Sequence, residues 1–248
     1  MTVFADLVEH LADLLEPLFA ASAAAAAIVL FTMCVRLAIH PLSRAAARGQ
    51  KAKARLAPQI AALRKKHGKD PQKLQKAIMA LHAEEKVSPA AGCLPSLLQA
   101  PAFLLMYHLF SNRQIGGEPN TLLGHELLAA PLGGRWHDAL ADGGPFGPAG
   151  LVYLALFAIV LAVATFNYRR TKTQLATVPS GAAPAAPGMA SMTRIMPFMS
   201  FLTLLTVVAV PLAAALYVVT SAAWSAAERY FLYRDMPSAS ATAAGALA

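Results

Sequence analysis

The chain has 248 residues, of which 57% are hydrophobic and 14% are charged, against about 25% charged residues in a typical soluble domain. Its mean hydropathy is +0.50 and its formal net charge is +8. This composition excludes a disordered chain and argues against an ordinary soluble domain. It favours a helical membrane protein that uses lipid as the solvent for much of its surface.

Four stretches without a charged residue are candidates to cross a bilayer, which takes about 20 apolar residues in a helix. They cover residues 17–35, 87–112, 143–168 and 195–227. The last is too long for one span and too short for two ordinary ones, and Pro211 near its middle would kink or break a helix. Length alone therefore leaves four or five spans open.

The positions of the basic residues favour five spans, because Lys and Arg stay on the cytoplasmic side of short loops. Residues 41–92 contain twelve of them and residues 169–194 contain four, whereas residues 1–35 contain none. Arg229 and Arg234, after the last stretch, favour a cytoplasmic C-terminus. The sequence thus predicts a multi-pass protein with its N-terminus outside and its C-terminus in the cytoplasm.

The predicted fold is all-α, with five transmembrane helices, an external N-terminal amphipathic helix and a cytoplasmic helical hairpin. In chain order we expect the external amphipathic helix over residues 1–18, a first span over 19–40, the basic hairpin over 41–88, a second span over 89–112, an external loop over 113–147, a third span over 148–168, a flexible cytoplasmic linker over 169–193, a fourth span over 194–210, a fifth over 211–233 and a disordered cytoplasmic tail over 234–248.

Local signals define the hairpin. Gly68 can end one helix, Asp70 can cap the next, and Pro71 suits the first helical position. Pro58 is expected to kink the first arm. Its basic surface can contact anionic lipid headgroups, and binding of ribosomal RNA is the alternative. The residues of this surface are Arg64, Lys65, Lys66, Lys69, Lys73 and Lys76.

The sequence contains no phosphate-binding loop, zinc motif or Cys pair, so it predicts no catalytic residue, no metal and no cofactor. One charge is unusual, because Arg36 lies inside an apolar run. Either its side chain extends to the headgroups, or it faces a wet cavity among the helices and attracts acidic groups. Polar walls for such a cavity could come from Gln99, Thr165, Asn167, Thr203, Thr206, Thr220 and Ser221.

Five motifs in a fixed order resemble the YidC family of membrane protein insertases. They are Val-Arg-Leu-Ala-Ile-His-Pro-Leu at 35–42, Leu-Ala-Pro-Gln-Ile at 56–60 with the basic run at 63–74, Val-Ser-Pro-Ala-Ala-Gly-Cys-Leu-Pro-Ser-Leu-Leu-Gln-Ala-Pro at 87–101, Arg-Ile-Met-Pro-Phe-Met at 194–199, and Pro211 followed by Leu216-Tyr217 and Trp224. The chain is most similar to the short Gram-positive or actinobacterial type, without a large extracytoplasmic domain.

The resemblance implies an insertase and chaperone of the bacterial cell membrane, not an enzyme. Arg36 matches the arginine of the family's polar, lipid-open groove, to which Trp224 would also belong, and the hairpin would recruit substrate. Implied partners are nascent membrane proteins and lipid, with the ribosome and the Sec translocon as further candidates and no DNA. Val218 and Ala222 depart from the family's usual Trp and Asn. A non-catalytic assembly scaffold therefore stays as an alternative, and a small-solute transporter as a weaker one.

Overall fold

The computed structural model describes residues 2–68, 70–88, 104, 107–112, 114–115, 117–176 and 195–234. Two helical stretches within these residues are long and apolar enough to cross a membrane, one inside residues 6–55 and one over residues 148–173. A shorter apolar stretch covers Met196–Ala209. The predicted second span, except for residues 104 and 107–112, most of the predicted linker, and the tail beyond residue 234 lie outside the described residues.

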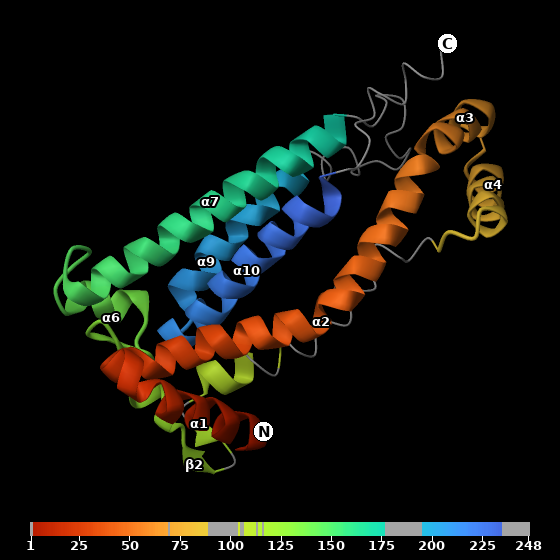
Figure 1. Ribbon diagram of the computed structural model, residues 1–248. Helices are drawn as coiled ribbons and strands as arrows, with labels where there is room; N and C mark the ends of the chain where they lie inside the picture. Colours follow the sequence, from red (N-terminus) through yellow and green to blue (C-terminus); the bar gives the residue numbers. More distant parts are fainter. Residues whose placement is uncertain are drawn as a thin grey trace. The chain divides into compact units, whose positions relative to one another are not determined.

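The chain is mainly helical (Figure 1). Its elements are α1 (Thr2–Phe19), η1 (Ala20–Ser22), α2 (Ala23–Arg55), α3 (Ala57–His67), α4 (Pro71–Glu84), β1 (Gln114–Ile115), β2 (Glu118–Pro119), η3 (Thr121–Gly124), β3 (Glu126–Leu127), β4 (Ala130–Pro131), α6 (Trp136–Ala141), α7 (Pro148–Ala176), η4 (Met196–Phe201), α9 (Leu202–Ala209) and α10 (Leu212–Tyr233).

The chain divides into two compact units. Unit 1 comprises residues 1–39, 99–167 and 198–227, and unit 2 comprises residues 40–98, 168–197 and 228–248. The long helices α2, α7 and α10 each contribute residues to both units.

Small residues allow close helix packing in unit 1. The first turns of α2 bury a run of alanines around Ile28, and α10 is buried from Leu212 to Val219. Side chains of this size let helix backbones approach closely, which is how helices associate in lipid. In Figure 1, α7, α9 and α10 run side by side.

One loop of unit 1 holds the start of α10. Because the first backbone N–H groups of a helix lack partners within the helix, they must bond elsewhere. Leu212 N–H donates to Gly134 O at 2.9 Å, and Ala213 N–H donates to Leu132 O at 2.9 Å. The Tyr153 hydroxyl of α7 donates to the same Gly134 oxygen at 2.7 Å. The loop before α6 thereby joins α7 to α10.

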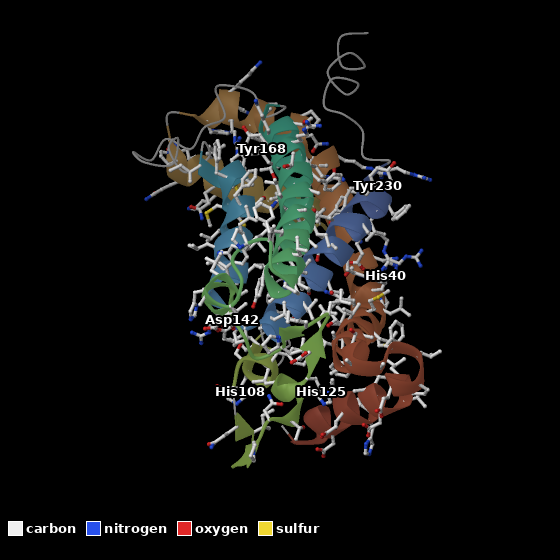
Figure 2. The ribbon with its side chains drawn as sticks, turned by 90° about the vertical axis from the view of Figure 1, so that its left-hand side faces the viewer. His40, His108, His125, Asp142, Tyr168 and Tyr230 are labelled. Carbon is white, nitrogen blue, oxygen red and sulfur yellow. The ribbon has the colours of Figure 1, made fainter. Side chains whose placement is uncertain are left out.

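Aromatic rings and short hairpins complete this part of unit 1. The Trp136 ring of α6 lies edge-on to Tyr153 and Phe157 of α7, with centroids 5.7 and 5.1 Å away. The strands β3 and β4 join through a two-residue turn in which Leu128 and Ala129 both have positive φ. In Figure 2, His108 and His125 lie at the same end of unit 1 as these strands.

Only part of the predicted apolar face of α1 packs against protein. Val8 and Ala12 are buried in the core of unit 1, whereas Leu14 and Leu18 are more than 70% exposed. The Thr121 hydroxyl donates to a Glu9 carboxylate oxygen at 2.8 Å. The apolar surface of α1 is thus divided between a protein-facing and an open side.

Pro211 separates α9 from α10, as the sequence predicted, whereas Pro58 does not kink the first arm of the hairpin. Helix α2 continues through Pro41 to Arg55, and Pro58 lies at the start of α3 instead of kinking its interior. A proline costs its helix one backbone hydrogen bond, a loss that long helices tolerate and that is absent in the first turn. Helix α7 is also longer than the predicted third span, because it continues past Tyr168 to Ala176.

The predicted hairpin of unit 2 is present as α3 and α4, which contact each other. The Asp70 carboxylate accepts from the backbone N–H groups of Gln72 and Lys73, both at 3.1 Å. Pro71 occupies the first helical position after this cap, as the sequence predicted. Capping by Asp satisfies two of the N–H groups that have no partner within the helix.

The two units differ sharply in charge. The ranges of unit 2 contain 18 of the 21 Lys and Arg residues and five of the 13 Asp and Glu residues. Unit 1 contains the other three basic and eight acidic residues. The formal net charge is therefore −5 for unit 1 and +13 for unit 2, which together give the +8 of the chain.

Candidate functional site

Arg36 of α2 donates hydrogen bonds to Ser221 of α10. Its Nε donates to Ser221 Oγ at 3.0 Å, and its Nη2 donates to Ser221 O at 3.1 Å. Nη2 also donates to Ser221 Oγ. The guanidinium is half-buried and Ser221 is buried, so the contact lies within the helices of unit 1 and not in open solvent.

The sequence of α10 produces this contact through helical spacing. Tyr217, Ser221 and Ser225 are four residues apart and share one face of the helix. Ser225 Oγ donates to Ser221 O at 2.9 Å, and Tyr217 interacts with both the Ser221 hydroxyl and the charge of Arg36. A polar stripe thus crosses a helix that is otherwise mainly Ala, Val and Leu.

The hydrogen bonds from Arg36 to Ser221 place no negative charge beside the guanidinium. A hydroxyl and a carbonyl accept hydrogen bonds but leave the guanidinium cationic. Helices α2, α7 and α9 contain no Asp or Glu, and α10 contains one, Glu228. A cation held by neutral groups in a poorly solvated place attracts anions more strongly than one at the surface.

The other predicted groove residues lie on the same unit. Thr165 and Asn167 are half-buried on α7, and Thr220 and Trp224 are half-buried on α10. The Trp224 Nε1 atom is buried and has no hydrogen-bond partner within the part of the chain that the structure describes. Gln99 lies outside the described residues. Arg36 forms a side-chain bond from α2 to α10, and its partner Ser221 is one of the residues that the sequence offered as polar walls.

The predicted recruitment surface lies on α3 and α4 of unit 2. Four lysines of this set are exposed and Arg64 is half-buried, whereas Lys69 is outside the described residues; the exposed ones are Lys65, Lys66, Lys73 and Lys76. The Lys73 ammonium lies 3.4 Å from a carboxylate oxygen of Asp70. Among the described residues, no group of three or more His, Cys, Asp or Glu could hold a metal ion.

A second contact between α2 and α10, which the sequence did not single out, lies within unit 2. His40 Nδ1 lies 2.6 Å from Glu228 Oε1. Arg170 of α7 donates to Arg229 O at 2.9 Å, and its guanidinium carbon lies 5.4 Å from the centre of the Tyr233 ring. The sequence did contain one signal for this contact, because Glu228 is the one Asp or Glu in α2, α7, α9 and α10.

Comparisons with known proteins identify the family of this chain and several relatives. The model of the family described as "60Kd inner membrane protein" matches residues 15–239. A protein of Azotobacter vinelandii named "Membrane protein insertase YidC" is 44% identical over 80 residues, which are 32% of this chain and 14% of that protein. The protein of the same name from Paraburkholderia phymatum is 38% identical over 102 residues, which are 41% of this chain and 18% of that protein. The matched segments thus span less than a fifth of these relatives.

Proposed function

The chain belongs to the 60Kd inner membrane protein family, the family of the YidC insertases, and from this we propose that it is a membrane protein insertase. It moves hydrophobic segments, with short polar tails, from the cytoplasm into the bilayer through a polar groove that is open to lipid. The observation that carries this proposal is the half-buried Arg36 guanidinium, held by Ser221 within an apolar helix pair.

The energetics of such a step are favourable without nucleotide hydrolysis. Insertion of about 20 Leu-like residues gains on the order of 10 kcal/mol, whereas each acidic residue at mid-bilayer costs about 2.5–3.5 kcal/mol. An ion pair 4 Å long contributes about 4 kcal/mol at the effective dielectric constant of a protein surface. Arg36 would therefore offset about one acidic residue of a client tail, and the hydrophobic segment would drive the rest.

The charge difference between the units supports the orientation that we propose. Unit 2, with its net charge of +13, would face the cytoplasm, and unit 1, with −5, would contain the spans and the external loop. This arrangement follows the preference of Lys and Arg for the cytoplasmic side. The exposed lysines of α3 and α4 would then be the first part of the protein that a client meets.

The test is insertion by the purified protein in liposomes. The client is a single-span protein with an acidic N-terminal tail, and the readout is protection of that tail from external protease. We expect protection with the native protein and a strong loss with Arg36→Ala. Arg44→Ala is the matched control, because Arg44 is also on α2 but is exposed.

Three results would count against the proposal. Equal protection by Arg36→Ala and the native protein would mean that Arg36 is not needed for insertion and that its side chain extends to the headgroups. No protection by either protein would favour a non-catalytic scaffold. Loss of protection with Arg44→Ala to the same degree would show that positive charge on α2, not the site of Arg36, is what matters.

A further inference from the structure

The carboxylate of Glu228 has an unusual setting. It is the one Asp or Glu in α2, α7, α9 and α10, and its side chain is only 12% exposed. A buried carboxylate needs a partner, because desolvation penalises its charge. Its described partner is the His40 ring, 2.6 Å away.

His40 is a replaceable partner for three reasons. First, its side chain is 37% exposed, three times as much as that of Glu228, so the histidine is the more accessible member of the pair. Second, a histidine carries a charge only when protonated, whereas Lys and Arg are permanent cations near neutral pH. Third, a permanent cation gains more from a poorly solvated carboxylate than a neutral ring does.

Arg170, a basic residue of the same unit, does not take the place of His40 beside Glu228. Arg170 donates to Arg229 O and lies over the Tyr233 ring. Its guanidinium is therefore used to hold the last turn of α10, where a cation also interacts favourably with the helix dipole. The described partner of Glu228 is therefore a histidine, although unit 2 is rich in Lys and Arg.

We propose that Glu228 is a binding site for a basic side chain of the client, the Lys or Arg that follows its hydrophobic segment. This inference rests on the proposed function for the identity of the ligand. His40 holds the carboxylate while the site is empty and moves aside when a client ammonium or guanidinium arrives. Such flanking residues must stay on the cytoplasmic side, which is where the proposed orientation places Glu228.

A zero-length cross-link tests the contact directly. The protein is placed in nanodiscs of uncharged phosphatidylcholine, so that both faces are accessible and lipid does not attract lysine. The probe is a synthetic peptide of 20 Leu and Ala residues with two C-terminal lysines. A carbodiimide then joins a carboxylate to an ammonium in contact with it, and mass spectrometry identifies the carboxylate.

We expect a cross-link from the peptide lysine to Glu228 that disappears in Glu228→Gln and persists in Glu85→Gln, a control at an exposed carboxylate of unit 2. The two His40 variants should act in opposite directions. His40→Ala removes the competing partner, so the yield should rise by about fivefold, as expected for the loss of a competing contact of about 1 kcal/mol. His40→Lys supplies a permanent internal cation, so the yield should fall.

Absence of the Glu228 cross-link in the native protein would overturn the proposal. So would an equal fall in both His40 variants, because that result means that the pair only holds α2 against α10. Protease protection of the acidic tail, measured in liposomes with the same proteins, separates the two proposals. A Glu228 cross-link without protection refutes the insertase and retains the site, and protection without the cross-link does the reverse.

Discussion

Ser221→Ala isolates the contact that holds Arg36. The substitution removes Oγ, which accepts from Nε at 3.0 Å and from Nη2, and keeps the backbone oxygen that accepts from Nη2 at 3.1 Å. Because both donors share the one Oγ atom, they are counted together as one hydrogen bond to a charged group, which contributes about 1.5–3 kcal/mol. Ala gains back about 0.5 kcal/mol in helix propensity. We therefore expect the free energy of unfolding to fall by about 2 kcal/mol, a change of about 30-fold in the unfolding equilibrium constant.

Denaturant titration in detergent micelles measures this change, and Ser225→Ala is the matched control. Ser225 Oγ donates to Ser221 O at 2.9 Å within the same helix, so its loss should cost less than about 1 kcal/mol. The double variant Arg36→Ala, Ser221→Ala adds a second check. If the bond accounts for the cost, Ser221→Ala should have little effect once Arg36 is absent.

The reasoning would be refuted by either of two results. An equal loss of stability in Ser221→Ala and Ser225→Ala would mean that α10 is sensitive to any lost hydroxyl. Additive effects of Arg36→Ala and Ser221→Ala would mean that the two side chains do not stabilise each other.

Three further substitutions have definite expected effects, each measured by the same denaturant titration. Tyr153→Phe removes the 2.7 Å bond to Gly134 O and should cost about 1 kcal/mol; no change would mean that this bond contributes nothing. Asp70→Ala removes a helix cap that accepts two backbone bonds and should cost about 1 kcal/mol, visible as lower helicity of α4, and unchanged helicity would contradict it. Gly150→Ala would place a Cβ 2.4 Å from Gly144 O, so the backbone before α7 must shift; a loss of more than about 1 kcal/mol is expected, and an unaltered titration would be inconsistent with this packing.

Local chemistry made some of these features predictable from the sequence. Asp70 is followed at once by Pro71 and the apolar periodicity of α4, and capping depends only on residues within one turn. Arg36 was identifiable because a charge within an apolar run is expensive wherever the helix packs. Both signals are independent of the rest of the fold.

The partner of Arg36 could not be assigned in the same way. Thr220, Ser221 and Ser225 all offer a hydroxyl, and neighbouring positions on a helix differ by about 100° around its axis. Which one faces α2 depends on the rotation of α10, which long-range packing determines. Pro58 was misjudged because its effect depends on where the helix begins. Helix α3 starts at Ala57, so Pro58 lies in the first turn, where it costs no hydrogen bond within the helix.

The separation of charge between the two units has an electrical consequence. A bacterial membrane is negative inside, and each elementary charge that crosses 100 mV does about 2.3 kcal/mol of work. In the proposed orientation, with unit 2 in the cytoplasm, inverting the protein would carry a net charge of +13 against the field, so the voltage would favour that orientation. The same voltage acts on a client tail with the opposite sign. Two acidic residues leaving the cytoplasm gain about 4–5 kcal/mol at 100 mV, so in the proposed function the potential that favours this orientation would also drive a client tail outward past Arg36.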